Sequence, residues 1–226
     1  MRWRRRSSRM SKSFKFFFAI LLLPLCVGTT KSLLRVIQTT GSADTIWVAF
    51  LSGATCWLVI YLLLPKPMLI YVFGHELTHV LWTWIFGGQV KRFKATSKGG
   101  HVIVTKDNFL ISLAPYFFPI YTAMIVAAFA LGHFIWGWAR FVVFFHLLIG
   151  AAYAFHITLT WNILKTRQSD ITQHGYLFSA VVIWLGNIGV LLVGIPTLTS
   201  RCDARTALVW CWIETCKIFV RIGNTF

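Results

Sequence analysis

Acidic side chains are scarce in this chain of 226 residues. Only six are present, and 12% of all residues are charged, about half of the charged fraction found in an ordinary soluble domain. Several apolar runs approach or exceed the roughly 20 residues that cross a bilayer. The composition therefore excludes a soluble globular protein. It predicts an all-α polytopic membrane protein with about 5–6 membrane segments.

Cysteine pairs of the metal-binding or redox type are also absent. The five cysteines include no C-x-x-C spacing and their number is odd, so we interpret them as small buried or interfacial side chains. Positive charge, by contrast, is plentiful, and the formal net charge is +16. The cations lie at the N-terminus and between apolar runs, as expected beside anionic lipid. The lipid bilayer is therefore the expected partner, and nucleic acid is not.

The apolar runs define three parts of the chain. Residues 1–13 are basic and serine-rich, and we expect a disordered arm. Residues 14–200 form the membrane domain, in which residues 14–28 are short for a full crossing. Residues 201–226 form an amphipathic tail that is expected to lie at the membrane interface. The predicted spans inside the membrane domain are residues 45–64, 68–86, 109–131, 134–163 and 176–198.

Two segments depart from this pattern of plain apolar spans. Pro115 and Pro119 predict a kink in the span 109–131. Residues 89–106 contain β-branched runs on either side of a glycine turn, which predicts a β-hairpin inserted into the helical fold. Its strand edge could pair with an extended substrate, although a basic loop anchored at the lipid surface is an equally good interpretation.

One charged side chain lies within the apolar segment 68–86. It is Glu76, and it is flanked by His75 and His79. The two histidines are four residues apart, so on a helix they project from one face, one turn apart. Such a pair can bind one zinc ion, and the glutamate between them can activate water. We therefore predict Zn²⁺ as the cofactor, His75 and His79 as metal ligands, and Glu76 as the catalytic base.

A structural role for Glu76 is the alternative interpretation. A buried carboxylate in a membrane helix must be paired or used, and partners for a polar clamp between helices exist on the span 134–163 at Arg140, His146 and His156. Two other functions also stay open. One is a catalytically silent membrane scaffold, and the other is a transporter that relays protons or binds a transported metal.

A catalytic zinc ion needs a third protein ligand and an open position. Asp170 follows two further crossings, so it returns to the side of the membrane on which the hairpin lies. We favour Asp170 as the third ligand, and His174, four residues later, is the main substitute. Alternatively, Asp170 only caps the last membrane helix.

The sequence Gly74-His75-Glu76-Leu77-Thr78-His79, the hairpin and the later aspartate together resemble the site-2-protease family of intramembrane zinc metalloproteases. The resemblance covers about residues 68–180. It implies a zinc metalloendopeptidase that hydrolyses peptide bonds in or near the membrane-spanning segments of substrate proteins. The family often has an adjacent Asp-Gly pair, whereas here Gly175 lies five residues after Asp170.

The distribution of cations also predicts the location of the site. By the positive-inside rule, the basic hairpin and the basic N-terminus both belong on the cytoplasmic side. We therefore expect a multi-pass protein of the plasma (inner) membrane, with its active site open to the cytoplasm. The hairpin and the N-terminus can both lie on the cytoplasmic side only if residues 14–28 do not fully cross, or if another segment is re-entrant.

Overall fold

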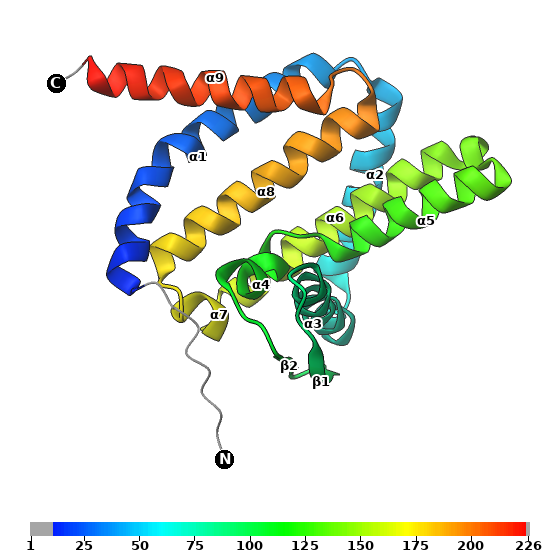
Figure 1. The fold of residues 1–226 in the computed structure, drawn as a ribbon. Helices are drawn as coiled ribbons and strands as arrows, with labels where there is room; N and C mark the ends of the chain where they lie inside the picture. The colour runs from blue at the N-terminus through cyan, green and yellow to red at the C-terminus, as the bar shows by residue number, and fades with distance from the viewer. Residues whose placement is uncertain (1–10, 225–226) are drawn as a thin grey trace.

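The computed structural model describes residues 11–224, which form a bundle of helices with a two-stranded hairpin at one end (Figure 1). This confirms the predicted helical fold with a small hairpin. The elements are α1 (Lys12–Thr40), α2 (Asp44–Leu63), α3 (Met68–Ile85), β1 (Val90–Thr96), β2 (Gly99–Val104), α4 (Phe109–Leu113), the 3-10 helix η1 (Ala114–Tyr116), α5 (Ile120–Trp136), the 3-10 helix η2 (Trp138–Phe141), α6 (Val142–Leu164), α7 (Ser169–Thr172), α8 (Tyr176–Thr199) and α9 (Ala204–Gly223).

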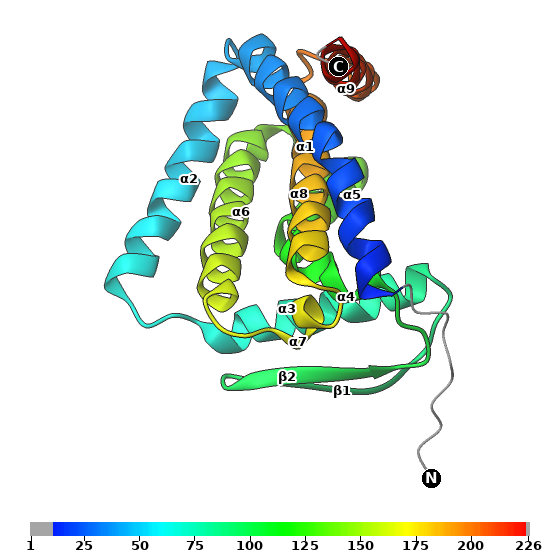
Figure 2. The ribbon, with the colours of Figure 1, turned by 90° about the vertical axis from the view of Figure 1, so that its left-hand side faces the viewer.

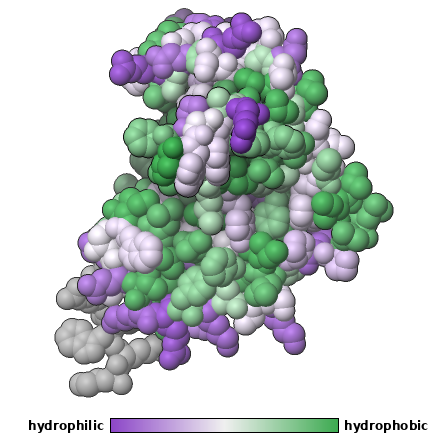
Figure 3. Space-filling view, turned by 90° about the vertical axis from the view of Figure 1, so that its right-hand side faces the viewer, coloured by the Kyte–Doolittle hydropathy of each residue, from purple (hydrophilic) through white to green (hydrophobic). Residues whose placement is uncertain are grey.

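Within this part of the chain, four helical segments are long and apolar enough to cross a membrane. They are α1, α2, η2 with α6, and α8. A fifth candidate combines α4 and η1 with α5, and this pair is bent by 82° where Pro115 and Pro119 predict a kink. In the view of Figure 3, hydrophobic residues cover much of the middle of the molecule and hydrophilic residues gather at the hairpin end.

Helix α3, which carries the histidine motif, is not one of these candidate spans. It lies across one end of the bundle, with the hairpin on its far side (Figure 2). Tyr71 and Val72 pack against Leu159 of α6, while the hairpin covers another face of α3. Protein thus buries part of α3, whereas Leu69, Ile70 and Trp84 on the same helix stay exposed. The helix at residues 68–86, expected to cross, is not among the candidate spans.

Helix α1 is longer than the apolar run suggests. Residues 1–10 of the predicted arm lie outside the described part, whereas Lys12 and Ser13 already belong to the helix. Ser11 caps it by accepting a hydrogen bond from the Phe14 backbone at 3.1 Å. The helix continues to Thr40 over 29 residues, so the short segment expected at 14–28 is half of a full-length helix. Its second half is less apolar and is buried against α8 and α9.

The course of the first three helices places the start of α1 near the hairpin. Helix α1 runs away from the hairpin end, α2 returns to it, and α3 stays there (Figure 2). The start of α1 and the hairpin therefore lie at the same end of the bundle. With α3 across the end of the bundle (Figure 2), the start of α1 and the hairpin can face the same side of a membrane, as the positive-inside rule expects.

The long helices form two groups. One contains α2, α5 and α6, and the other contains α1, α8 and α9. Helices α2 and α6 meet backbone to backbone, because a Cβ atom at Gly53 would lie 1.8 Å from the Leu147 carbonyl oxygen and one at Gly150 would lie 1.9 Å from that of Phe50. Close approach at small residues is typical of helices that associate in membranes. Helices α3 and α4 lie across the end of both groups.

Candidate metal centre

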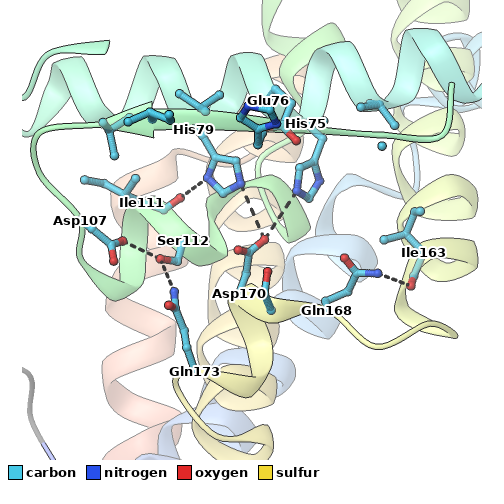
Figure 4. Close-up of a pocket in the computed structure, with 18 of the residues that line it drawn as sticks. His75, Glu76, His79, Asp107, Ile111, Ser112, Ile163, Gln168, Asp170 and Gln173 are labelled. Atoms are coloured by element: carbon cyan, nitrogen blue, oxygen red, sulfur yellow. Dashed lines mark hydrogen bonds and ion pairs between the residues drawn. The ribbon is translucent and has the colours of Figure 1, made fainter. Parts of the chain in front are cut away.

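Helix α3 presents the two histidines of the motif on one face, as the spacing predicts. The ring centroids of His75 and His79 are 5.1 Å apart. Both rings point towards α7, the short helix that connects α6 to α8 and carries Asp170 (Figure 4). The site is therefore assembled from two segments that are almost a hundred residues apart in the sequence.

Asp170 faces both imidazoles through a single oxygen atom. Its Oδ2 lies 3.8 Å from His75 Nε2 and 3.7 Å from His79 Nε2, and the three possible ligand atoms lie within 4.8 Å of one another. These separations are too long for hydrogen bonds. They are slightly longer than the ~3.4 Å between ligand atoms that bind zinc tetrahedrally at about 2.1 Å. The three side chains would therefore have to move closer together to coordinate one ion.

The hydrogen bonding of His79 also suits a metal ligand. Its Nδ1 lies 2.8 Å from the carbonyl oxygen of Ile111, and a carbonyl can only accept, so Nδ1 carries the proton. Nε2 then presents its lone pair towards Asp170. The Ile111 backbone is itself held by the side chain of Asn108, which caps α4 and accepts from the Ile111 N–H at 2.9 Å.

Tyr116 is a residue of this site that the sequence does not reveal. Its hydroxyl donates a hydrogen bond of 3.1 Å to Asp170 Oδ2, and its ring meets that of His75 edge-on at 5.2 Å. Only 1% of Tyr116 is exposed. Asn187 of α8 donates to the Tyr116 carbonyl at 3.1 Å. No spacing relates Tyr116 to the histidine motif, so only the fold identifies it.

A second set of hydrogen bonds holds α7 against α4. Gln173 Nε2 donates to Ser112 Oγ at 2.9 Å, and Ser112 Oγ donates to Asp107 Oδ1 at 2.8 Å. All three residues line the cavity that contains the metal candidates. They fix the short helix from which Asp170 projects.

The structure favours neither of the two alternatives, namely His174 as the third ligand and Asp170 as a helix cap. His174 turns away from the site, and its Nδ1 lies 2.6 Å from Lys15 Nζ of α1. Among the described residues, it does not belong to the group that could hold a metal ion. Asp170 lies inside α7, while the N-cap of α8 is Gly175. Asp170 therefore does not cap α8.

Glu76 is buried in the same cavity, which has a volume of about 570 Å³. Strand β2 closes over it, because a Cβ atom at Gly100 would lie 2.7 Å from Glu76 Cγ. Within the described part of the chain, no ion pair joins Glu76 to the clamp candidates Arg140, His146 and His156. The carboxylate thus lies beside the histidines and beneath the hairpin.

The two carboxylates of the site, Glu76 and Asp170, differ in the direction in which their pKa is shifted. Burial raises the pKa of Glu76 from 4.5 to about 7. Burial would also raise the pKa of Asp170, but its contacts with His75 and His79 outweigh that effect and hold the pKa well below its usual range. At neutral pH Asp170 is therefore ionised, as a ligand requires, while Glu76 can both accept and release a proton.

Taken together, the fold and the site define a helical protein of the membrane type with a candidate metal centre at one end of its bundle. The donor set of two imidazoles and one carboxylate is one that catalytic zinc sites use. A second carboxylate of raised pKa lies next to it. No family model, curated protein or solved structure matches the chain.

Proposed function

We propose that this protein is a membrane-bound zinc metalloendopeptidase of the site-2-protease type. Its substrates would be peptide bonds in or near the membrane-spanning segments of other proteins. The observation that carries the proposal is the convergence of His75 Nε2 and His79 Nε2 on one oxygen of Asp170, with Glu76 buried in the same cavity. The motif would supply two ligands and a base, and the position of Asp170 beside the two histidines supports it as the third ligand.

In this mechanism His75, His79 and Asp170 would hold the zinc ion. When bound, zinc lowers the pKa of a water molecule and polarises the scissile carbonyl. Glu76 accepts a proton from the attacking water and donates it to the leaving amide nitrogen as the C–N bond breaks. A pKa of about 7 for Glu76 suits both transfers at neutral pH.

The surroundings of the cavity support an extended substrate. A helical substrate hides its carbonyls in its own hydrogen bonds and must be unwound locally before hydrolysis. Strand β2 pairs with β1 along one edge, and residues 99–104 of β2 line the cavity. An unwound segment could pair with β2 while its carbonyl lies near Glu76. Because α3 lies at the end of the bundle, we expect cleavage near the end of a substrate span.

The decisive experiment combines metal analysis with cleavage of a membrane-spanning reporter. The parent protein should bind one zinc ion and cleave the reporter. Glu76→Gln should retain the metal and lose activity by about 10²–10⁴-fold. His75→Ala and Asp170→Ala should lose the metal, whereas His174→Ala should keep it because this side chain faces Lys15.

Other results would point to the competing functions. A folded parent protein without stoichiometric zinc contradicts the proposal. Metal binding without cleavage by either the parent or Glu76→Gln indicates a silent scaffold. Flux of protons or metal ions into vesicles, abolished in Glu76→Gln, indicates a transporter.

A further inference from the structure

Helix α9 lies at the end of the bundle opposite the candidate metal centre (Figures 1 and 2). One face of it is docked tightly onto α1. A Cβ atom at Gly28 would lie 2.8 Å from the Thr215 backbone, and Ser32 Oγ donates to the Ala207 carbonyl at 2.8 Å. The orientation of α9 about its own axis is therefore fixed by α1.

The face of α9 that points away from α1 is strongly apolar. Trp212 is 71% exposed, and four more large hydrophobic side chains on this helix are more than half exposed, namely Leu208, Val209, Phe219 and Val220. An exposed apolar face next to charged residues on one helix is typical of a helix that lies in the boundary between headgroups and acyl chains. This face thus matches the acyl-chain region of a lipid.

The edge of α9 next to α1 carries an excess of positive charge. Glu214 forms ion pairs with Arg35 at 2.8 Å and with Lys217 at 2.9 Å. Lys31 interacts with the same carboxylate. Lys31, Lys217 and Arg221 also line a cavity of about 630 Å³ between α1 and α9, together with Trp212. Arg35, Lys217 and Lys31 thus share the charge of one carboxylate, which leaves an excess of positive charge at this site.

We propose that this cavity between α1 and α9 binds the phosphodiester headgroup of an anionic glycerophospholipid through Lys31, Lys217 and Arg221. The acyl chains then lie along the apolar face of α9. Charge complementarity selects an anionic headgroup over a zwitterionic one. The adjoining apolar face selects a lipid over a free phosphate ion, which has no apolar part to bury.

The test is native mass spectrometry of the full chain in detergent, with phosphatidylglycerol or phosphatidylcholine added. The parent should bind phosphatidylglycerol preferentially. A variant that combines Lys31→Gln, Lys217→Gln and Arg221→Gln should lose about tenfold or more of this preference, since each cation contributes to the attraction. The matched control removes three cations from the hairpin, by Lys91→Gln, Lys94→Gln and Lys98→Gln, and should keep the preference.

Two further measurements address misfolding of the triple variant and binding of free phosphate. If the triple variant does not purify as a folded protein, Lys31→Gln alone should reduce the preference by roughly threefold. Inorganic phosphate should not displace phosphatidylglycerol at equal concentration. The proposal is overturned if the cavity variants bind both lipids as the parent does, if the hairpin control loses the preference instead, or if free phosphate competes fully.

Discussion

The hydroxyl of Tyr116 and the carboxylate of Asp170 are 3.1 Å apart, and the bond ends on the oxygen atom that faces both imidazoles. This oxygen of Asp170 is thus held by a side chain from η1, which precedes α5. Tyr116 is in turn held by Asn187 of α8. The position of Asp170 therefore depends on elements from both groups of helices.

The first prediction concerns this bond. Tyr116→Phe removes the donor and leaves the packing nearly intact, so the position of Asp170 becomes less restricted. We expect zinc affinity to fall by about 10–100-fold, the usual effect of losing a group that orients a metal ligand. Competition with a chelator of known affinity measures the loss. Tyr153→Phe, a hydroxyl removed from α6 away from the site, should leave affinity unchanged. Equal affinity in Tyr116→Phe and the parent would contradict the role of Tyr116.

The second prediction concerns the contact between the hairpin and Glu76. A methyl group at Gly100 would come within 2.7 Å of Glu76 Cγ and 2.6 Å of the Lys94 carbonyl oxygen. Gly100→Ala should therefore push the hairpin away from Glu76, lowering peptidase activity by about tenfold or more while the zinc content stays at the parent level. The control is Gly189→Ala on α8, where the added methyl group meets open space. Full activity in Gly100→Ala would show that the hairpin does not position the base.

The third prediction concerns the pH dependence of stability in metal-free protein. The folded state binds the proton of Glu76 more tightly than the unfolded state, because burial raises its pKa from 4.5 to about 7. Between these two values the unfolding free energy contributed by Glu76 falls as pH rises. The melting temperature of the parent should therefore fall relative to that of Glu76→Gln between pH 4.5 and pH 7. Thermal melts in a chelator give the difference, and an opposite slope would rule out a raised pKa.

The fourth prediction concerns topology. In a variant whose natural cysteines are replaced by serine, Lys12→Cys and Lys98→Cys should react with an impermeant thiol reagent from the same side of the membrane. Ser42→Cys, in the turn between α1 and α2, should react from the opposite side. This follows from the crossing of α1, the return of α2 and the transverse position of α3. Labelling of residues 12 and 98 from opposite sides would mean that α3 crosses.

The sequence predicts those parts of the fold that depend on local patterns. The helical period places His75 and His79 on one face, the glycine turn predicts the hairpin, and the prolines predict the bend before α5. The parity of crossings places Asp170 on the hairpin side of the bundle, where it lies. Each of these inferences depends on the spacing of residues or on the number of apolar segments, and both can be read from the sequence.

Other features depend on tertiary packing, which local patterns in the sequence do not reveal. An apolar run such as that of α3 has the same composition whether it crosses a membrane or lies across the end of a bundle, as α3 does (Figure 2). The apolar run does not predict the full length of α1, because the second half of this helix packs against α8 and α9. The position of Tyr116 follows from the 82° bend that turns η1 towards α7, and no local pattern gives that direction.

The division of the long helices into two groups has a consequence for the candidate centre. Helix α3 follows α2 of one group, while Asp170 sits on the connection that leads from α6 of that group to α8 of the other. A bound ion would link α3 to this connection and so hold the two groups of helices together. Its removal would free the two halves to separate at the end where the hairpin lies.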